Sequence, residues 1–258
     1  MHKIAISPEI KALAERQRGG RAHLLDQLDL ARTAHLVVDL QNGFMEPGAP
    51  VEVPCAREIV PAVNAISAAV RQAGGVNVFL RMTTTQESLQ SWSNWCRYFH
   101  NPASISGMAE AFAPEAHHWR LWPELDVQDT DIKVDKTRFG AFVPGASMLH
   151  EVLQARGIDT LIITGTLTNC CCESTARDAM QMNYKLIFVA DANAAMSDAA
   201  HNGTLDNMCM LFADVMTADE VLGVIRRSAG ARTCRRRSYK AFFISPLRGR
   251  SGPAIEAG

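Results

Sequence analysis

Residue types that can act together in hydrolysis follow three predicted strands of this chain, each at the point where its strand ends. Asp39 follows the apolar run LVV, Lys136 follows IKVD, and the cysteines 170–172 follow TLIITGTLTN. The carboxyl ends of parallel strands meet at one edge of an open α/β sheet, where the ligand crevice lies. A thiol at a helix N-terminus has a lowered pKa because of the helix dipole, and a nearby lysine would stabilise its thiolate further. A buried aspartate can take the thiol proton and return it to a leaving amine, so the set predicts a cysteine-dependent hydrolase.

Each of these residue types also has an ordinary structural explanation. An aspartate at a strand end is often a turn former, a lysine there is often a solvated charge, and free cysteine is often a small core residue. Their coincidence at three strand ends favours catalysis. The cysteine run also leaves open a redox sensor, which would be oxidised by peroxide without turning over an amide.

The sequence gives no reason to assign a metal. Successive helical residues point about 100° apart, so three adjacent thiols cannot converge on one ion. His117 and His118 are likewise adjacent, and no H-x-x-x-H or H-E-x-x-H spacing occurs. We therefore expect a site without a metal.

The elements that would position these residues alternate between short apolar runs and segments of helical periodicity. The strands are predicted at 35–40, 76–81, 132–135, 160–165, 185–191 and 213–218. The helices are predicted at 56–74, 146–156, 170–182, 198–211 and 218–228. This alternation predicts a three-layer α/β/α fold with a doubly wound, mostly parallel, six-stranded sheet of Rossmann-like type.

The predicted domain, residues 30–230, has an extension at each end and one insertion. Residues 1–29 read as a helical arm interrupted by glycines, and 231–258 as a basic tail that we expect to be disordered. Residues 82–130 are too long for a plain crossover, so we expect an insertion or lid there. Its aromatic residues fall at the spacing of one helix face and either close the pocket or form a packing or subunit interface: Trp92, Trp95, Tyr98 and Phe99.

Composition excludes several classes of protein. The chain has 258 residues, 47% apolar and 21% charged, with a net charge of −1, which argues against a disordered protein, a nucleic-acid binder or a membrane-surface protein. Seven cysteines, an odd number with three adjacent, do not suggest a disulfide framework. With no apolar run of 18 residues and a charged N-terminal segment, we expect a cytoplasmic protein.

Three sequence blocks resemble the signature blocks of isochorismatase-like cysteine hydrolases. They are VVDLQNGF at 37–44, KTRFGAF at 136–142 and GTLTNCCCESTARDA at 165–179. The third block, G-x-x-T-N-x-C-x-E-S-T-A-x-x-A, is the most specific. The resemblance, together with the order of strands and helices, covers roughly residues 30–228.

The resemblance implies a role for each matching residue. Cys171 stands at the position of the nucleophile, with Cys170 and Cys172 as packing neighbours, while Asp39 matches the general acid/base and Lys136 the residue that supports the thiolate. It further implies a non-proline cis peptide from Leu167 to Thr168 and an oxyanion held by backbone amides of Cys171 and Thr168. The implied reaction is amide or ureido hydrolysis through a thioester, with no organic cofactor.

Departures from family patterns narrow the substrate class. True isochorismatases lack the nucleophilic cysteine, and nicotinamidases carry a D-x-H metal motif after the second strand, where this chain reads LRMTTTQES. Ureidoacrylate, N-carbamoylsarcosine, biuret and maleamate hydrolases remain, and the N-C-C-C-E-S-T run is most similar to the first of these. The resemblance also implies a homo-oligomer, a dimer or a tetramer.

Residues next to the catalytic positions are the best candidates to contact a small-molecule substrate. They are Asn42, Phe44, Arg138 and Phe139, to which Trp92 and Trp95 of the insertion are added. Arg138 has the chemistry to pair with a substrate carboxylate, although a solvated loop arginine is an equal alternative. A catalytically silent binding or scaffold protein on the same fold is the main alternative to an enzyme.

Overall fold

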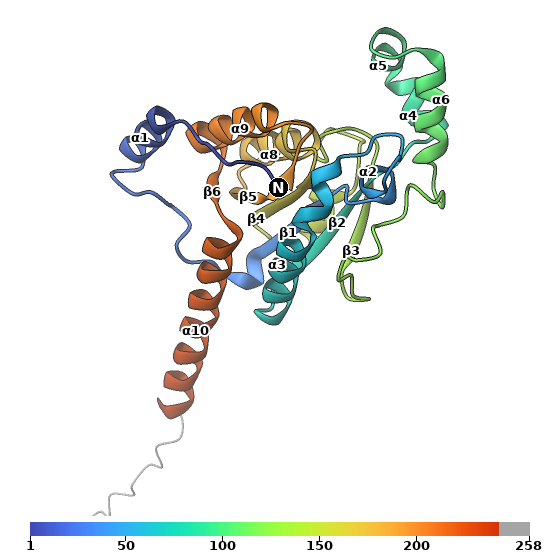
Figure 1. Cartoon of the computed structure of the whole chain (residues 1–258). Helices are drawn as coiled ribbons and strands as arrows, with labels where there is room; N and C mark the ends of the chain where they lie inside the picture. Colours follow the sequence, from blue (N-terminus) through green and yellow to red (C-terminus); the bar gives the residue numbers. More distant parts are fainter. Residues whose placement is uncertain (243–258) are drawn as a thin grey trace, which may run out of the picture.

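The structure is a computed structural model that describes residues 1–242, with side chains described up to residue 230. Its centre is a six-stranded sheet in the order β3-β2-β1-β4-β5-β6, and all five strand pairings are parallel (Figure 1). The strands are β1 (Thr33–Val38), β2 (Val76–Met82), β3 (Ile132–Lys136), β4 (Thr160–Thr166), β5 (Lys185–Ala194) and β6 (Asp214–Met216). The predicted doubly wound α/β/α fold is confirmed.

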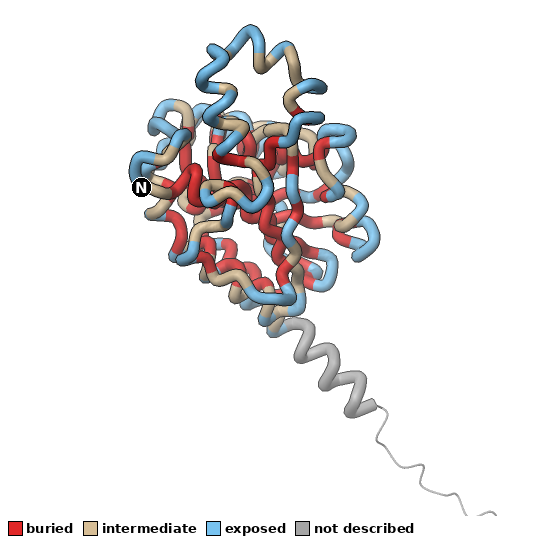
Figure 2. Tube along the Cα trace, turned by 90° about the vertical axis from the view of Figure 1, so that its right-hand side faces the viewer, coloured by how far each residue is buried: buried red, intermediate tan, exposed pale blue. Residues whose placement is uncertain are grey.

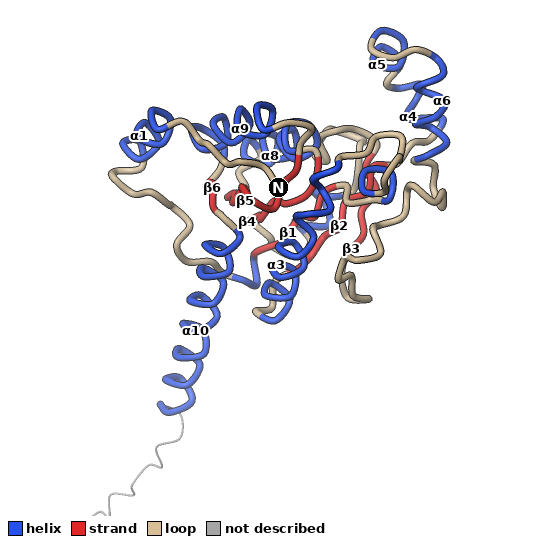
Figure 3. Tube along the Cα trace, viewed as in Figure 1, coloured by secondary structure: helices blue, strands red, loops and turns tan. Residues whose placement is uncertain are grey.

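Helices cover both faces of this sheet, as Figure 3 shows. On one face, α3 (Val60–Gln72) and α10 (Ala218–Phe242) pack against a core that includes Val37, Phe79 and Ile162. On the other face, α7 (Leu149–Gln154), α8 (Glu173–Gln181) and α9 (Asp198–Asn207) enclose a second core. Every residue of β1 and of β4 is buried, which is why apolar residues dominate both strands. Figure 2 shows that the buried segments gather in the middle of the body.

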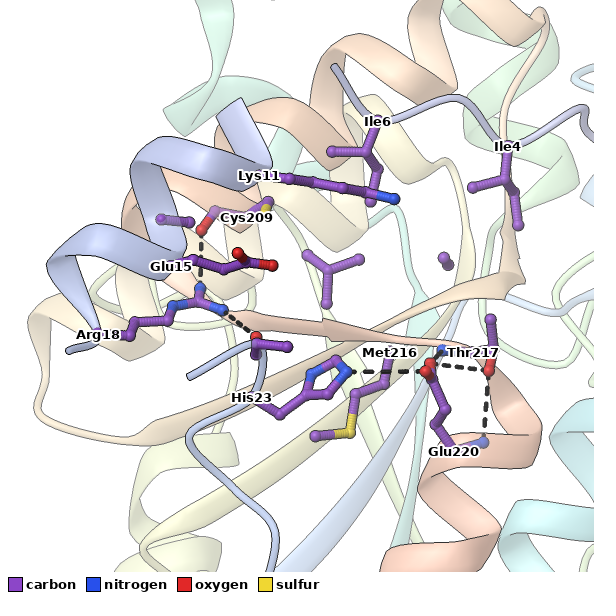
Figure 4. A pocket seen from close by; sticks show the side chains of 14 residues that line it. Ile4, Ile6, Lys11, Glu15, Arg18, His23, Cys209, Met216, Thr217 and Glu220 are labelled. Carbon is purple, nitrogen blue, oxygen red and sulfur yellow. Dashed lines mark hydrogen bonds and ion pairs between the residues drawn. The ribbon is translucent and has the colours of Figure 1, made fainter. Parts of the chain in front are cut away.

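The N-terminal arm docks against the β6 edge of the sheet. It contains α1 (Pro8–Gln17) and is anchored on the buried carboxylate of Asp214, which accepts hydrogen bonds from Arg18 (3.3 Å) and from the amides of Leu24 (2.6 Å) and Leu25 (2.9 Å). Figure 4 shows the hollow that remains between the arm and the sheet, where Arg18 also reaches the carbonyl of Cys209 (2.7 Å). None of the candidate catalytic residues lines this hollow.

The insertion between β2 and β3 forms three short helices that project from the body near the β3 edge (Figure 1). These are α4 (Gln86–Ser91), α5 (Ser93–Tyr98) and α6 (Pro102–Ala111). The prediction of a single aromatic helix face is wrong, because the backbone leaves the helical conformation at Trp92 and two helices result. Trp92 and Trp95 stack on each other with ring centroids 4.4 Å apart, whereas Tyr98 and Phe99 are 80% and 77% exposed.

The C-terminal helix extends further than the sequence indicated. We expected an unstructured tail from residue 231, but α10 continues to Phe242, and only residues 243–258 of that predicted tail lie outside the described part of the chain. Within the described residues, no helix combines the length and apolar character needed to cross a bilayer.

Candidate active site

A buried ion pair joins the ends of β1 and β3. The Lys136 ammonium lies 2.8 Å from a carboxylate oxygen of Asp39, and both side chains are fully buried. Lys136 also donates to the carbonyl of Arg138 (3.0 Å) and lies 3.9 Å from the Met82 sulfur. Asp39 and Lys136 therefore lie together, as their positions at the ends of parallel strands predicted.

Cys171, which follows the end of β4, lies next to this pair. It lies in a π-helical turn, Thr168–Cys172, which follows β4 and leads directly into α8. Its thiol lies close enough to Asp39 and to Cys170 to lower the pKa of both, and its side chain is almost completely buried. Cys172 is fully buried in the core and Cys170 is partly exposed, so only Cys171 joins burial to contact with the acid.

The electrostatics of these groups are mutually dependent. Burial raises the pKa of Asp39, and the charge of Lys136 and the hydrogen bond from Cys171 oppose that rise. Burial alone would lower the pKa of Lys136, but the charges of Asp39 and Cys171 keep it above its ordinary value. A protonated lysine beside a buried carboxylate is the result.

The pKa of Cys171 differs from the sequence expectation. The hydrogen bond with Cys170 and burial raise it well above the ordinary thiol value, although the charge of Lys136 acts in the other direction. This direction is opposite to the lowering that a helix dipole alone would produce. A protonated Cys171 beside Asp39 is an arrangement in which the proton can pass to the carboxylate as the sulfur attacks.

The backbone around the cysteine turn is fixed by a close approach of β4 to β1. Gly165 has φ +124°, and a Cβ there would lie 2.1 Å from the carbonyl oxygen of Val38, so only glycine fits. The cis peptide lies between Thr166 and Leu167, one bond earlier than the predicted Leu167–Thr168 bond. A matched motif alone did not distinguish two neighbouring peptide bonds.

Asp39 itself adopts a left-handed backbone conformation, with φ +51°. Aspartate and asparagine tolerate this region better than most residues. The next residue but one, Gln41, is fully buried and was missed in the sequence. Its side chain donates to the carbonyls of Met82 (3.0 Å) and Trp119 (2.7 Å) and accepts from the Met82 amide (2.7 Å). Gln41 thus locks the loop after β1 to the end of β2 and to the chain returning from the insertion.

A second group that the sequence did not reveal supports the cysteine turn from α9. His201 is fully buried and its Nδ1 lies 2.9 Å from the hydroxyl of Thr168. Burial lowers the pKa of His201 to about 4, so the ring is neutral at ordinary pH. His2 stacks on it with ring centroids 4.3 Å apart, which places the N-terminal segment behind the turn. Only the three-dimensional fold could reveal a contact across so many residues.

The predicted substrate-contacting aromatics divide into two groups. Phe139 packs edge-on against Trp92 (4.9 Å) and Trp95 (5.7 Å), and the Arg138 guanidinium lies 4.9 Å from the Trp92 ring centre. A small hollow beneath the insertion is lined by both tryptophans together with Met82, which also contacts Lys136. The tryptophans and Phe139 therefore form an aromatic wall, which Met82 connects to Lys136.

The other two substrate candidates after β1 serve the packing of the loop. Phe44 is buried against Phe112, with ring centroids 4.9 Å apart. Asn42 is buried and donates from its amide nitrogen to the carbonyl of His117 (3.0 Å). Its Oδ1 is buried and has no hydrogen-bond partner among the described residues.

An aspartate, a lysine and a cysteine thus converge at the carboxyl edge of a parallel α/β sheet. The Isochorismatase domain model matches residues 33–220, and the chain belongs to the isochorismatase family.

Curated relatives and a solved structure agree with this assignment. The chain is 31% identical over 201 residues to the uncharacterized isochorismatase family protein YecD of Escherichia coli O157:H7, covering 77% of this chain and 99% of YecD. It is 29% identical over 206 residues to the ureidoacrylate amidohydrolase RutB of Variovorax paradoxus, covering 75% of this chain and 81% of RutB. The crystal structure of a cysteine hydrolase from Pseudomonas syringae pv. phaseolicola 1448A superposes with a TM-score of 0.67 at 29% identity, covering 78% of this chain and 95% of that one.

Proposed function

We propose that this protein is a cysteine-dependent amidohydrolase that cleaves a C–N bond of a small amide or ureido compound through a thioester. The observation that carries the proposal is the buried Asp39–Lys136 pair in contact with the Cys171 thiol. Isolating two charges from water is costly, and proteins tend to retain such arrangements where the charges have a task.

The proposed reaction has two half-steps. The sulfur of Cys171 bonds to the substrate carbonyl carbon as its proton passes to Asp39, and backbone amides of Thr168 and Cys171 hold the oxyanion. The C–N bond then breaks, and Asp39 gives its proton to the departing nitrogen. Water next attacks the thioester while Asp39 takes its proton, the C–S bond breaks, and the proton returns to the thiol. Lys136 stays charged throughout and stabilises whichever partner carries the negative charge.

Ureido compounds are the favoured substrate class. Relatives named ureidoacrylate amidohydrolase share 26% to 29% identity with this chain over most of its length. The buried Oδ1 of Asn42 offers an acceptor for a ureido N–H. The aromatic wall of Trp92, Trp95 and Phe139 suits the planar face of a conjugated ureido acid.

We also propose that the enzyme works in the cytoplasm as a homo-oligomer, a dimer or a tetramer. Tyr98 and Phe99 offer large exposed rings on the insertion for contact with a second copy. Light scattering coupled to size-exclusion chromatography tests this, and a monomeric mass at micromolar concentration contradicts it.

The experiment that tests the proposed function is ammonia release from a panel of ureido and amide compounds. The intact chain should release ammonia, and Cys171→Ala should not, while its fold is preserved in circular dichroism. Cys170→Ala and Cys172→Ala are matched controls that should retain substantial activity. Equal loss in all three variants would refute the assignment of the nucleophile. Silence of the intact chain across the panel would favour the binding-protein alternative, and peroxide-dependent oxidation without turnover would favour a redox sensor.

A further inference from the structure

Two histidines and a glutamate meet on the surface at the base of the insertion. Nε2 of His117 lies 2.7 Å, and Nε2 of His118 3.7 Å, from one carboxylate oxygen of Glu46. The three ligand atoms all lie within 4.8 Å of one another. We propose that Glu46, His117 and His118 form a binding site for a divalent transition metal, with zinc as the best fit.

The site is held in place by backbone contacts on both sides. Glu46 directly follows the short helix α2 (Asn42–Met45), whose Gly43 amide donates to the carbonyl of His118 (2.9 Å). The Asn42 side chain donates to the carbonyl of His117 (3.0 Å), and the Asn42 amide to that of Arg120 (2.8 Å). Because the two segments are already joined, closing the ligands on an ion requires only side-chain adjustment.

The donor set and spacing favour zinc over the common hard cations. Two imidazole nitrogens and one carboxylate oxygen are a recognised zinc ligand set, whereas calcium and magnesium prefer oxygen donors alone. Zinc bonds of about 2.0 to 2.1 Å in a tetrahedron place the ligand atoms roughly 3.3 Å apart. The observed 2.7 Å and 3.7 Å bracket that separation. His117 is exposed, which leaves a side open to water as the fourth ligand.

This site is distinct from the metal motif that the sequence lacks. The D-x-H motif would lie directly after β2, where the chain reads MTTTQES, whereas these ligands come from the loop after α2 and from the segment after α6. The sequence did not predict it because adjacent histidines show no metal spacing and Glu46 lies 71 residues away from His117.

An ion here would act on the base of the insertion and not on the reacting atoms. It would tie the loop that follows the catalytic strand β1 to the chain returning from α6, where Phe44 already packs on Phe112. Binding should therefore stabilise the protein and restrict the movement of the insertion, in addition to any effect on turnover.

Isothermal titration of the chelator-treated full chain with zinc chloride tests the proposal, and Co²⁺ absorption identifies the ligand type. The intact chain should bind one zinc ion at this site and unfold at a higher temperature in its presence. His117→Ala, His118→Ala and Glu46→Gln should each weaken binding by at least about tenfold, since loss of outer-shell partners alone costs that much. His150→Ala removes a histidine outside the cluster and should bind zinc as the intact chain does.

The Co²⁺ spectrum separates this site from the active-site thiols. The proposed ligands predict ligand-field bands without the near-ultraviolet charge-transfer absorption of a thiolate ligand. Thiolate absorption that disappears in Cys171→Ala would place the metal at the cysteines and overturn the proposal. Equal zinc affinity in the intact chain and the three ligand variants would overturn it as well. Neither result bears on ammonia release by the metal-free chain, so the proposed function is tested separately.

Discussion

Replacing Asp39 with asparagine removes one charge of the buried pair and should be costly to both stability and catalysis. Lys136 is fully buried, and without Asp39 its remaining contacts are the Arg138 carbonyl and the Met82 sulfur. Breaking a buried ion pair by removing one partner costs about 3 to 5 kcal/mol. In a chain of this size each kcal/mol lowers the melting temperature by roughly 2 to 4 °C, so Tm should fall by about 6 to 20 °C. Asparagine tolerates the left-handed backbone of this position, so the loss reports on charge and not on strain.

The same variant should lose turnover by a factor of about 10² to 10⁴, because the group that accepts and returns the proton is gone. Thermal unfolding followed by circular dichroism measures the first effect and ammonia release from the best panel substrate measures the second. The double variant Asp39→Asn/Lys136→Met separates them. It contains no unpaired buried charge, so most of the lost stability should return while activity stays absent.

Two results would refute this reasoning. A Tm within 2 °C of the intact chain for Asp39→Asn would mean that the pair is not a desolvated ion pair, since the expected drop is roughly 6 to 20 °C. Restored turnover in the double variant would mean that Asp39 supports the fold and takes no part in proton transfer. Coupling between the two substitutions is expected because the side chains are in direct contact.

Three further outcomes are expected. Gly165→Ala would force a Cβ to within 2.1 Å of the Val38 carbonyl oxygen. Urea denaturation should therefore show that the free energy of unfolding falls by at least about 1 to 3 kcal/mol. An unchanged urea midpoint would contradict the close approach of the two strands. Burial lowers the pKa of His35 to about 3 and that of His201 to about 4. Below pH 6.5 the unfolded chain therefore binds more protons than the folded chain. As the pH is lowered from roughly 6.5 to 4, the free energy of unfolding should fall by about 1.4 kcal/mol per histidine for each pH unit. His201→Gln should lower the number of protons taken up on unfolding by one and so reduce the slope of stability against pH. An unaltered slope would exclude a buried neutral ring at this position. Iodoacetamide at neutral pH should modify Cys170 before the two buried thiols beside it, because Cys170 is partly exposed and the neighbouring Cys171 lowers its pKa. Peptide mass mapping checks the order.

The parts of the fold that follow from burial on both sheet faces were predictable. β1 and β4 are buried along their whole length, so apolar residues dominate both sequences, although β1 contains His35 and β4 contains Thr164. Because parallel strands end at one edge, the polar residues that follow those runs had to converge. Asp39 and Lys136 could therefore be placed together before any coordinates, and the motif then selected Cys171 among three adjacent cysteines.

The parts that depend on contacts between distant segments were not predictable. The helical spacing of the insertion did not reveal the break at Trp92, because a helix pattern carries no sign of a turn that tertiary packing imposes. His201 behind the cysteine turn, Gln41 across the strand ends and Glu46 beside its histidines each meet partners more than 30 residues away. Periodicity reports neighbours on one element, and these contacts join different ones.

The direction of the Cys171 pKa is opposite to the one that a helix N-terminus alone would produce. A helix dipole and a lysine both favour the thiolate, but the lysine is already paired with Asp39, and the net charge that Cys171 faces is close to zero. Desolvation and the hydrogen bond with Cys170 then decide the outcome, and the thiol keeps its proton. In such a site the thiolate is not present before the reaction. Asp39 can accept the thiol proton, and the transfer takes place as the sulfur donates electrons to a substrate carbonyl. The charge then formed on the substrate faces backbone amides and not bulk water, so transition-state stabilisation takes over the role that a low thiol pKa would otherwise have.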